Sequence, residues 1–192
     1  MIIADPAVAA VAAASLGGAL LIALALSIAG LRHARTAPVA ISCALAAAAL
    51  ITALVAPITS APLALRLPVI LLAMTVAVIG GSPFTRRALD IASGDRVRET
   101  RDGGILIIAA DASAPRTLMR GGTVIGFLER VAAAVAITVG FPEAVAAVIA
   151  VKGIGRFPEL GEPEARERFI IGTVASLLWA GAVGAIARLA LL

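Results

Sequence analysis

The sequence has few of the residues on which soluble enzymes and disulfide-bonded domains depend. Its 192 residues include one cysteine, one histidine and no tyrosine, and only 15% of them are charged. The single cysteine, Cys43, excludes an intrachain disulfide, and the single histidine, His33, is too few for the ligand sets of a zinc site. Because charged residues are so scarce, the chain also lacks the polar surface that a soluble domain of this length needs.

Catalytic and nucleotide-binding motifs are missing as well. The sequence contains no H-E-x-x-H, no P-loop, no G-x-S-x-G and no cysteine pair. We therefore predict no enzymatic activity, no metal and no cofactor. The net charge is only +4, and the arginines lie mostly between apolar runs, where the bias of basic residues towards the cytoplasmic side of a membrane explains them. No nucleic-acid partner is predicted.

Long apolar runs are what the sequence has instead. Apolar residues make up 61% of the chain, so much of the surface must face lipid. The runs are uniformly apolar and rich in Ala and Leu, which excludes the alternating pattern of a membrane barrel and leaves helices as the spanning structure. At ~20 residues per span, the sequence predicts an all-α, polytopic transmembrane helix bundle of about six spans.

The predicted spans divide the chain into three parts. Residues 1–81 form a three-span part, residues 82–120 a basic cytoplasmic loop, and residues 121–192 a helical hairpin followed by a final span. In the loop, residues 104–110 predict a short strand, which needs a partner because one strand is not stable alone. The fourth and fifth segments either cross the bilayer or form a re-entrant hairpin. The predicted segments are residues 7–31, 38–56, 67–81, 122–141, 144–157 and 169–188.

The distribution of basic residues predicts the orientation. With the N-terminus outside, thirteen of the sixteen Lys and Arg residues fall on the cytoplasmic side, Arg66 and Arg188 fall outside, and Arg130 lies within a helix. The first apolar run has no preceding basic residue and exceeds the ~7–15 residues of a signal peptide core, so we expect it to remain as a span. The expected location is the inner (plasma) membrane.

Four charged residues in the last third form the candidate site. Glu129 lies twelve residues before Phe141, at the expected turn, and Lys152 lies eleven residues after it. In an antiparallel hairpin equal residue counts mean equal depth, so Glu129 and Arg130 should lie level with Lys152, and Arg156 shares the helix face of Lys152. An ionised residue in hydrocarbon usually pairs or faces water. The cluster is either a structural clamp or the lining of an ion, proton or anionic-headgroup site.

Small residues recur at a spacing of four in the same third of the chain. This spacing lets helix backbones approach closely in lipid. It predicts packing within the chain, although an oligomer interface would use the same pattern, and Trp179 is expected to be a mid-span packing residue. The predicted helix-packing residues are Gly122, Gly126, Gly172, Ser176, Ala180 and Gly184.

Three motifs in this third resemble a known module. The segments 125–130 (I-G-F-L-E-R), 152–157 (K-G-I-G-R-F) and 171–176 (I-G-T-V-A-S) resemble the C-terminal part of a domain-of-unknown-function family of bacterial membrane proteins. The resemblance covers about seventy residues. It implies that Glu129, Arg130, Lys152 and Arg156 act as a unit, and it implies no reaction.

These features favour a non-enzymatic assembly or interaction subunit. Its expected partners are the lipid bilayer, anionic lipid at the basic loop, and a second copy of the chain or a membrane partner protein. The alternative is a small ion or solute transporter or channel that uses Glu129 and Lys152. A third hypothesis, an intramembrane enzyme acting on lipid, would depend on Ser176 or Thr173 near Glu129.

Overall fold

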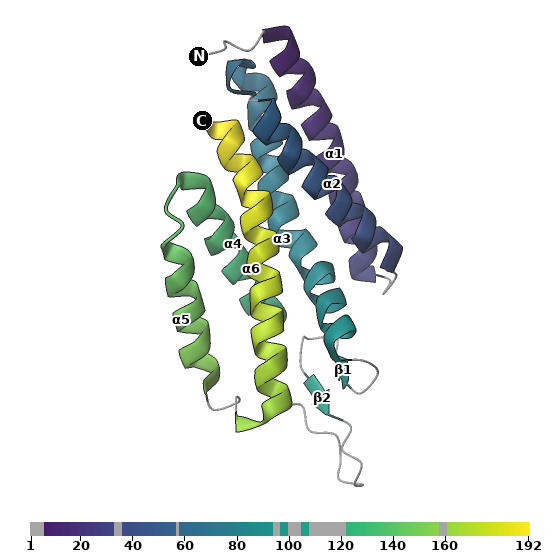
Figure 1. Cartoon of the computed structure of the whole chain (residues 1–192), viewed down its shortest axis with the longest axis vertical. Helices are drawn as coiled ribbons and strands as arrows, with labels where there is room; N and C mark the ends of the chain where they lie inside the picture. The colour runs from purple at the N-terminus through teal and green to yellow at the C-terminus, as the bar shows by residue number, and fades with distance from the viewer. Residues whose placement is uncertain are drawn as a thin grey trace.

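The chain folds into a bundle of long helices, as the sequence predicts (Figure 1). The computed structural model describes residues 6–32, 36–56, 58–93, 97–99, 105–107, 122–157 and 161–192. Within these ranges there are six α-helices and a short 3-10 helix, η1 (Ile58–Ser60). The α-helices are α1 (Pro6–Arg32), α2 (Thr36–Val55), α3 (Leu63–Ser93), α4 (Gly122–Val139), α5 (Ala144–Arg156) and α6 (Pro163–Leu191).

Helices α3 and α6 form the centre of the bundle. They pack against each other along their length, α1 covers α3 with α2 beside it, and α4 covers α6 (Figure 1). The buried core consists largely of alanine, with Leu16, Leu20, Val76 and Ile186 among its larger members. Small side chains allow close helix approach in lipid, where the packing itself drives association. The start of α1 and the end of α6 lie towards the same end of the bundle (Figure 1).

Five of the described helices are long and apolar enough to cross a membrane: α1, α2, α3, α4 and α6. Helix α5 has 13 residues, which corresponds to ~20 Å at ~1.5 Å per residue. The hydrocarbon core of a bilayer is ~30 Å thick. The helical bundle is therefore confirmed, with five candidate spans where about six were predicted: α5 is too short for a full span, while α4 has the required length.

Helix α3 extends twelve residues beyond its predicted end at Gly81 and reaches Ser93. The helix thus passes the predicted boundary between residues 81 and 82, because residues 82–93 continue α3. Pro83 lies inside α3, and a proline removes a backbone donor. Packing holds the helix past this point, since Phe84 stacks on Trp179 with ring centroids 5.3 Å apart.

Helix α6 begins six residues before the predicted Phe169, at Pro163. The first part of α6, residues 163–168, is rich in charged residues, which is typical of a solvated connection. Pro163 occupies the start of the helix, where its missing N–H leaves no bond unmade. Arg168, expected in the loop, is buried at 8% exposure, so the polar start of α6 belongs to the bundle.

Two short strands follow α3. β1 (Val97–Glu99) pairs in antiparallel fashion with β2 (Ile105–Ile107), with Val97 opposite Ile107. β2 thus lies within the predicted strand at residues 104–110. Residues 104 and 108–110, like most of the predicted basic loop, lie outside the described residues.

Arginine side chains lie near both ends of the two central helices: Arg66 and Arg188 at one level along the bundle, Arg86 and Arg168 at the other. Arg66, at the start of α3, donates from Nε to the carbonyl of Ala190 at 2.8 Å, so it lies at the end of α6 near Arg188. Arg66 and Arg86 are twenty residues apart on α3, and Arg168 and Arg188 are twenty apart on α6. Twenty helical residues span ~30 Å, which equals the thickness of the hydrocarbon core.

Candidate functional site

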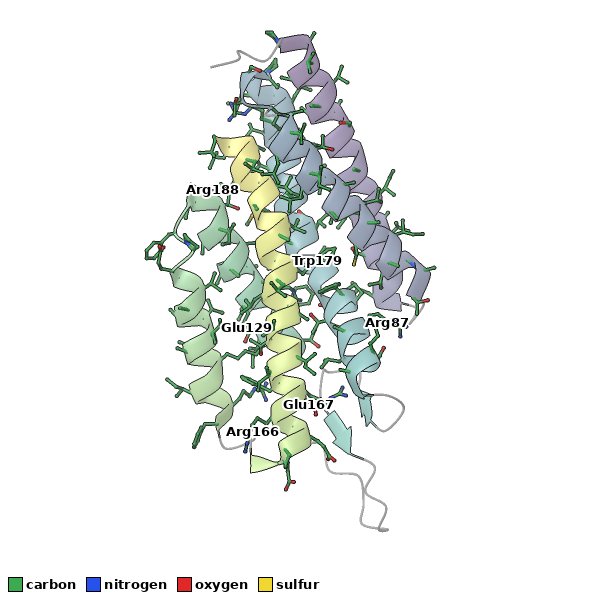
Figure 2. The ribbon with its side chains drawn as sticks, viewed as in Figure 1. Arg87, Glu129, Arg166, Glu167, Trp179 and Arg188 are labelled. Atoms are coloured by element: carbon green, nitrogen blue, oxygen red, sulfur yellow. The ribbon has the colours of Figure 1, made fainter. Side chains whose placement is uncertain are left out.

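The structure brings Glu129 of α4 and Lys152 of α5 into direct contact. The Lys152 ammonium nitrogen lies 2.5 Å from Glu129 Oε2, and it also lies over the ring of Phe169, 5.7 Å from the centroid. Glu129 is only 7% exposed. In Figure 2, Glu129 lies at a level between Arg188, near the end of α6, and Arg166, near its start.

The turn between α4 and α5 sets the register of this pair. Gly140 has φ +84°, a conformation that glycine adopts without strain. A Cβ atom at Gly140 would overlap the guanidinium of Arg188. The turn is therefore fixed against the end of α6, and equal residue counts on α4 and α5 bring Glu129 and Lys152 to one level.

Arg130 connects three helices from inside the bundle. It is 4% exposed, and its Nε donates to the carbonyl of Val78 at 2.7 Å. Nη1 donates to Ser176 Oγ at 3.2 Å and Nη2 to Ser82 Oγ at 2.7 Å. In the described part of the chain its hydrogen-bond acceptors are all neutral, so Lys152 and not Arg130 pairs directly with Glu129. A guanidinium has five N–H donors, and these bonds use three of them.

Glycines provide the space for the Arg130 side chain. A Cβ atom at Gly81 of α3 would overlap its Cδ, and one at Gly126 would lie 3.2 Å from Nη1. Trp179 lies directly beside this site, and its indole nitrogen donates to the carbonyl of Val76 at 3.0 Å. The small residues thus permit a buried cation, in addition to close helix packing.

Residue counts along α3, α4 and α6 each place the Glu129 and Arg130 site at the same depth in the bundle. Val78 lies twelve residues from Arg66, Ser176 twelve from Arg188, and Glu129 twelve from Phe141. Twelve residues correspond to ~18 Å of helix. If the two arginine levels mark the edges of the hydrocarbon, the Glu129 and Arg130 side chains lie near its middle.

A cavity of about 170 Å³ opens next to these charges, between α3, α4, α5 and α6. Five basic side chains and one carboxylate, that of Glu129, line it, together with five hydroxyl groups and Phe169. The basic residues are Arg86, Arg130, Lys152, Arg156 and Arg168, and the hydroxyl groups belong to Ser82, Thr85, Thr123, Thr173 and Ser176.

Three buried polar atoms in the cavity wall have no hydrogen-bond partner in the described structure. They are Oε1 of Glu129 and the hydroxyl oxygens of Thr85 and Thr173. A buried polar atom left unsatisfied costs ~1–3 kcal/mol. The cavity therefore needs water or a polar ligand to complete its hydrogen bonding.

The predicted small residues have two different roles. On α6, Gly184 lies against the backbone of Ala134: a Cβ atom at Gly184 would lie 3.2 Å from the Ala134 carbonyl oxygen. Gly172 faces Leu89. Ala180 is fully buried and Ser176 binds Arg130. These four residues pack within the chain. Gly172 and Ser176 also line the cavity, as do Gly122 and Gly126.

Sequence reasoning missed half of the cavity. Ser82, Thr85 and Arg86 come from the part of α3 that had been assigned to a loop, and Arg168 from the unpredicted start of α6. Thr85 and Arg86 lie in residues 85–92, whose amphipathic spacing predicts a helical extension, and α3 includes this segment.

No protein-family model, no curated protein and no solved structure matches this chain. The apolar helices define the class: this is a helical integral membrane protein. The resemblance of its last third to a domain-of-unknown-function family stays a prediction.

The ion pair generates a first prediction. Lys152→Met leaves the buried Glu129 carboxylate without its partner and should destabilise the protein on the order of 3 kcal/mol. Glu129→Gln should cost less, because the longer Lys152 side chain can turn towards the polar interface. The double variant should be more stable than Lys152→Met alone. Thermal unfolding of the purified protein in detergent measures all three.

The matched control is Glu143→Gln, which removes a carboxylate from the exposed turn after α4. It should unfold as the wild type does. Strictly additive losses from the two single substitutions would show that the two charges do not depend on each other.

Proposed function

We propose that this membrane protein is a non-enzymatic binding protein for an anionic group, which it holds in the cavity between α3 and α6. The supporting observation is the excess of basic over acidic side chains in the cavity wall, five against one. In a low-dielectric environment such an excess attracts an anion strongly. The proposal is closest to the predicted solute transporter that uses Glu129 and Lys152.

Arg130 supports an anion as the ligand in particular. It is a buried cation whose hydrogen-bond acceptors in the described residues are neutral. Arginine binds carboxylate and phosphate groups well because its planar donors match their oxygens. The hydroxyl groups of Thr85 and Thr173 supply further donors in the same wall.

The packing beyond the cavity favours a binding site over an open channel. Trp179 is 6% exposed and stacks with Phe84. Further along α6, the backbones of Gly184 and Ala134 touch. An anion that enters the cavity would therefore stop near the middle of the bundle, and passage across would require these contacts to open.

Anion binding predicts a specific thermal shift. Inorganic phosphate, compared with chloride at equal ionic strength, should raise the melting temperature of the purified full chain, because a ligand that binds only the folded state stabilises it. Arg156→Gln, at the cavity wall, should weaken the apparent phosphate affinity by about tenfold.

Arg166→Gln is the matched control, since Arg166 is exposed on α6 and does not line the cavity. Its phosphate response should equal that of the wild type. Equal loss of response in both variants would indicate general charge screening, and no response in the wild type would overturn the proposed function.

For the orientation, we propose the N-terminus outside and the basic segment in the cytoplasm. Support comes from the concentration of arginines at residues 86–120. In a Cys43→Ser background, Pro142→Cys, at the turn after α4, should react with an impermeant maleimide in intact cells, whereas Arg101→Cys should react only after lysis. The reverse pattern would invert the topology.

An assembly role is the second candidate, favoured by the exposure of α5. No residue of α5 is buried, and it lies at the edge of the bundle (Figure 1). In the Cys43→Ser background, Ile154→Cys on α5 should form a discrete crosslinked product in membranes. Leu54→Cys, equally apolar and exposed on α2, should not. If neither forms a product, lipid alone covers α5.

A further inference from the structure

A second hollow adjoins the charged cavity on the other side of the ion pair. It is a groove of about 530 Å³ between α4 and α5, within the ~300–1,000 Å³ range of ligand sites. Its apolar walls include Leu128, Ala132, Val148 and Val151. Ile125, Glu129, Lys152 and Arg156 line both the groove and the cavity, so the two spaces meet at the ion pair.

The two spaces differ in chemistry in the way that the two ends of a lipid differ. The cavity carries basic side chains and hydroxyl groups, and the groove carries aliphatic side chains. The groove reaches along α5 to Ala147, closer to the turn at Gly140 than the ion pair is. It therefore extends into the hydrocarbon, where an acyl chain would lie.

We propose that the anionic group is the phosphate headgroup of a bilayer phospholipid, held in the cavity while one acyl chain lies in the groove between α4 and α5. This inference rests on the proposed anion-binding function. A free phosphate would occupy only the cavity, whereas a phospholipid would use both the cavity and the groove, which share four lining residues.

The unsatisfied carboxylate oxygen of Glu129 further limits which headgroups would fit the cavity. Glu129 Oε1 is buried without a hydrogen-bond partner in the described structure, and a carboxylate only accepts hydrogen bonds. A phosphate next to Arg130 would leave this oxygen in need of a donor. A headgroup that carries hydroxyl groups beyond its phosphate, such as glycerol, supplies both functions.

Filling the groove tests the inference without touching the charges. Ala147 lies in the groove wall and is exposed, so Ala147→Leu inserts a side chain where the acyl chain would lie. Ala150→Leu makes the same change on the same helix, at an exposed position outside the groove. Neither substitution enters the buried core.

Phosphatidylglycerol and phosphatidylcholine are titrated into the purified full chain in detergent, and native mass spectrometry counts the bound lipid. The wild type should bind phosphatidylglycerol at least about tenfold more tightly than phosphatidylcholine. Ala147→Leu should weaken the phosphatidylglycerol affinity by about the same factor, and Ala150→Leu should leave it unchanged. The melting-temperature response to inorganic phosphate should persist in both variants.

The possible failures separate the inference from the proposed function. Equal phosphatidylglycerol affinity in Ala147→Leu and Ala150→Leu, with the phosphate response intact, would overturn the lipid assignment and leave a soluble anion as the ligand. Equal binding of the two lipids by the wild type would also overturn it. Loss of both the phosphate response and the lipid preference in the wild type would overturn the proposed function as well.

Discussion

A guanidinium buried between the helices, that of Arg130, is the constraint on which the rest of the structure depends. Arg130 is only 4% exposed, so most of its donors must find acceptors inside the bundle, or the charge would be too costly to bury. The carbonyl of Val78 and the hydroxyl groups of Ser82 and Ser176 supply them from the two neighbouring helices. These bonds align α3, α4 and α6 at one level, and each helix is therefore placed by the same side chain.

That alignment explains features of the fold that look unrelated in the sequence. Gly81 leaves room for the Arg130 side chain, and Gly80 leaves room for Trp179. The same stretch of α3 then continues through Pro83, because Phe84 stacks on Trp179. A proline that ordinarily interrupts a helix is tolerated here, since neighbouring helices hold the segment on both sides.

The bundle is consequently divided into two halves of opposite character. Towards Arg66 and Arg188 it is tightly packed with alanine and glycine, and backbones touch at Gly184. Towards Arg86 and Arg168 the helices enclose a basic cavity that adjoins an apolar groove. The Glu129–Lys152 pair lies where the cavity meets the groove. This arrangement suits a ligand with a charged end and an apolar end, held from one side of the membrane.

The sequence alone determined the membrane class, the helices, and the common depth of Glu129 and Lys152, because these follow from apolar length and from the constant rise of a helix. It also indicated a small-residue face on α6. Only the tertiary structure decided the ends of α3 and α6, the neutral acceptors of Arg130, and the cavity. Propensity and hydropathy describe one segment at a time. The continuation of α3 through Pro83 and the burial of Arg168 depend on contacts with other helices, which the hydropathy of a single segment does not describe.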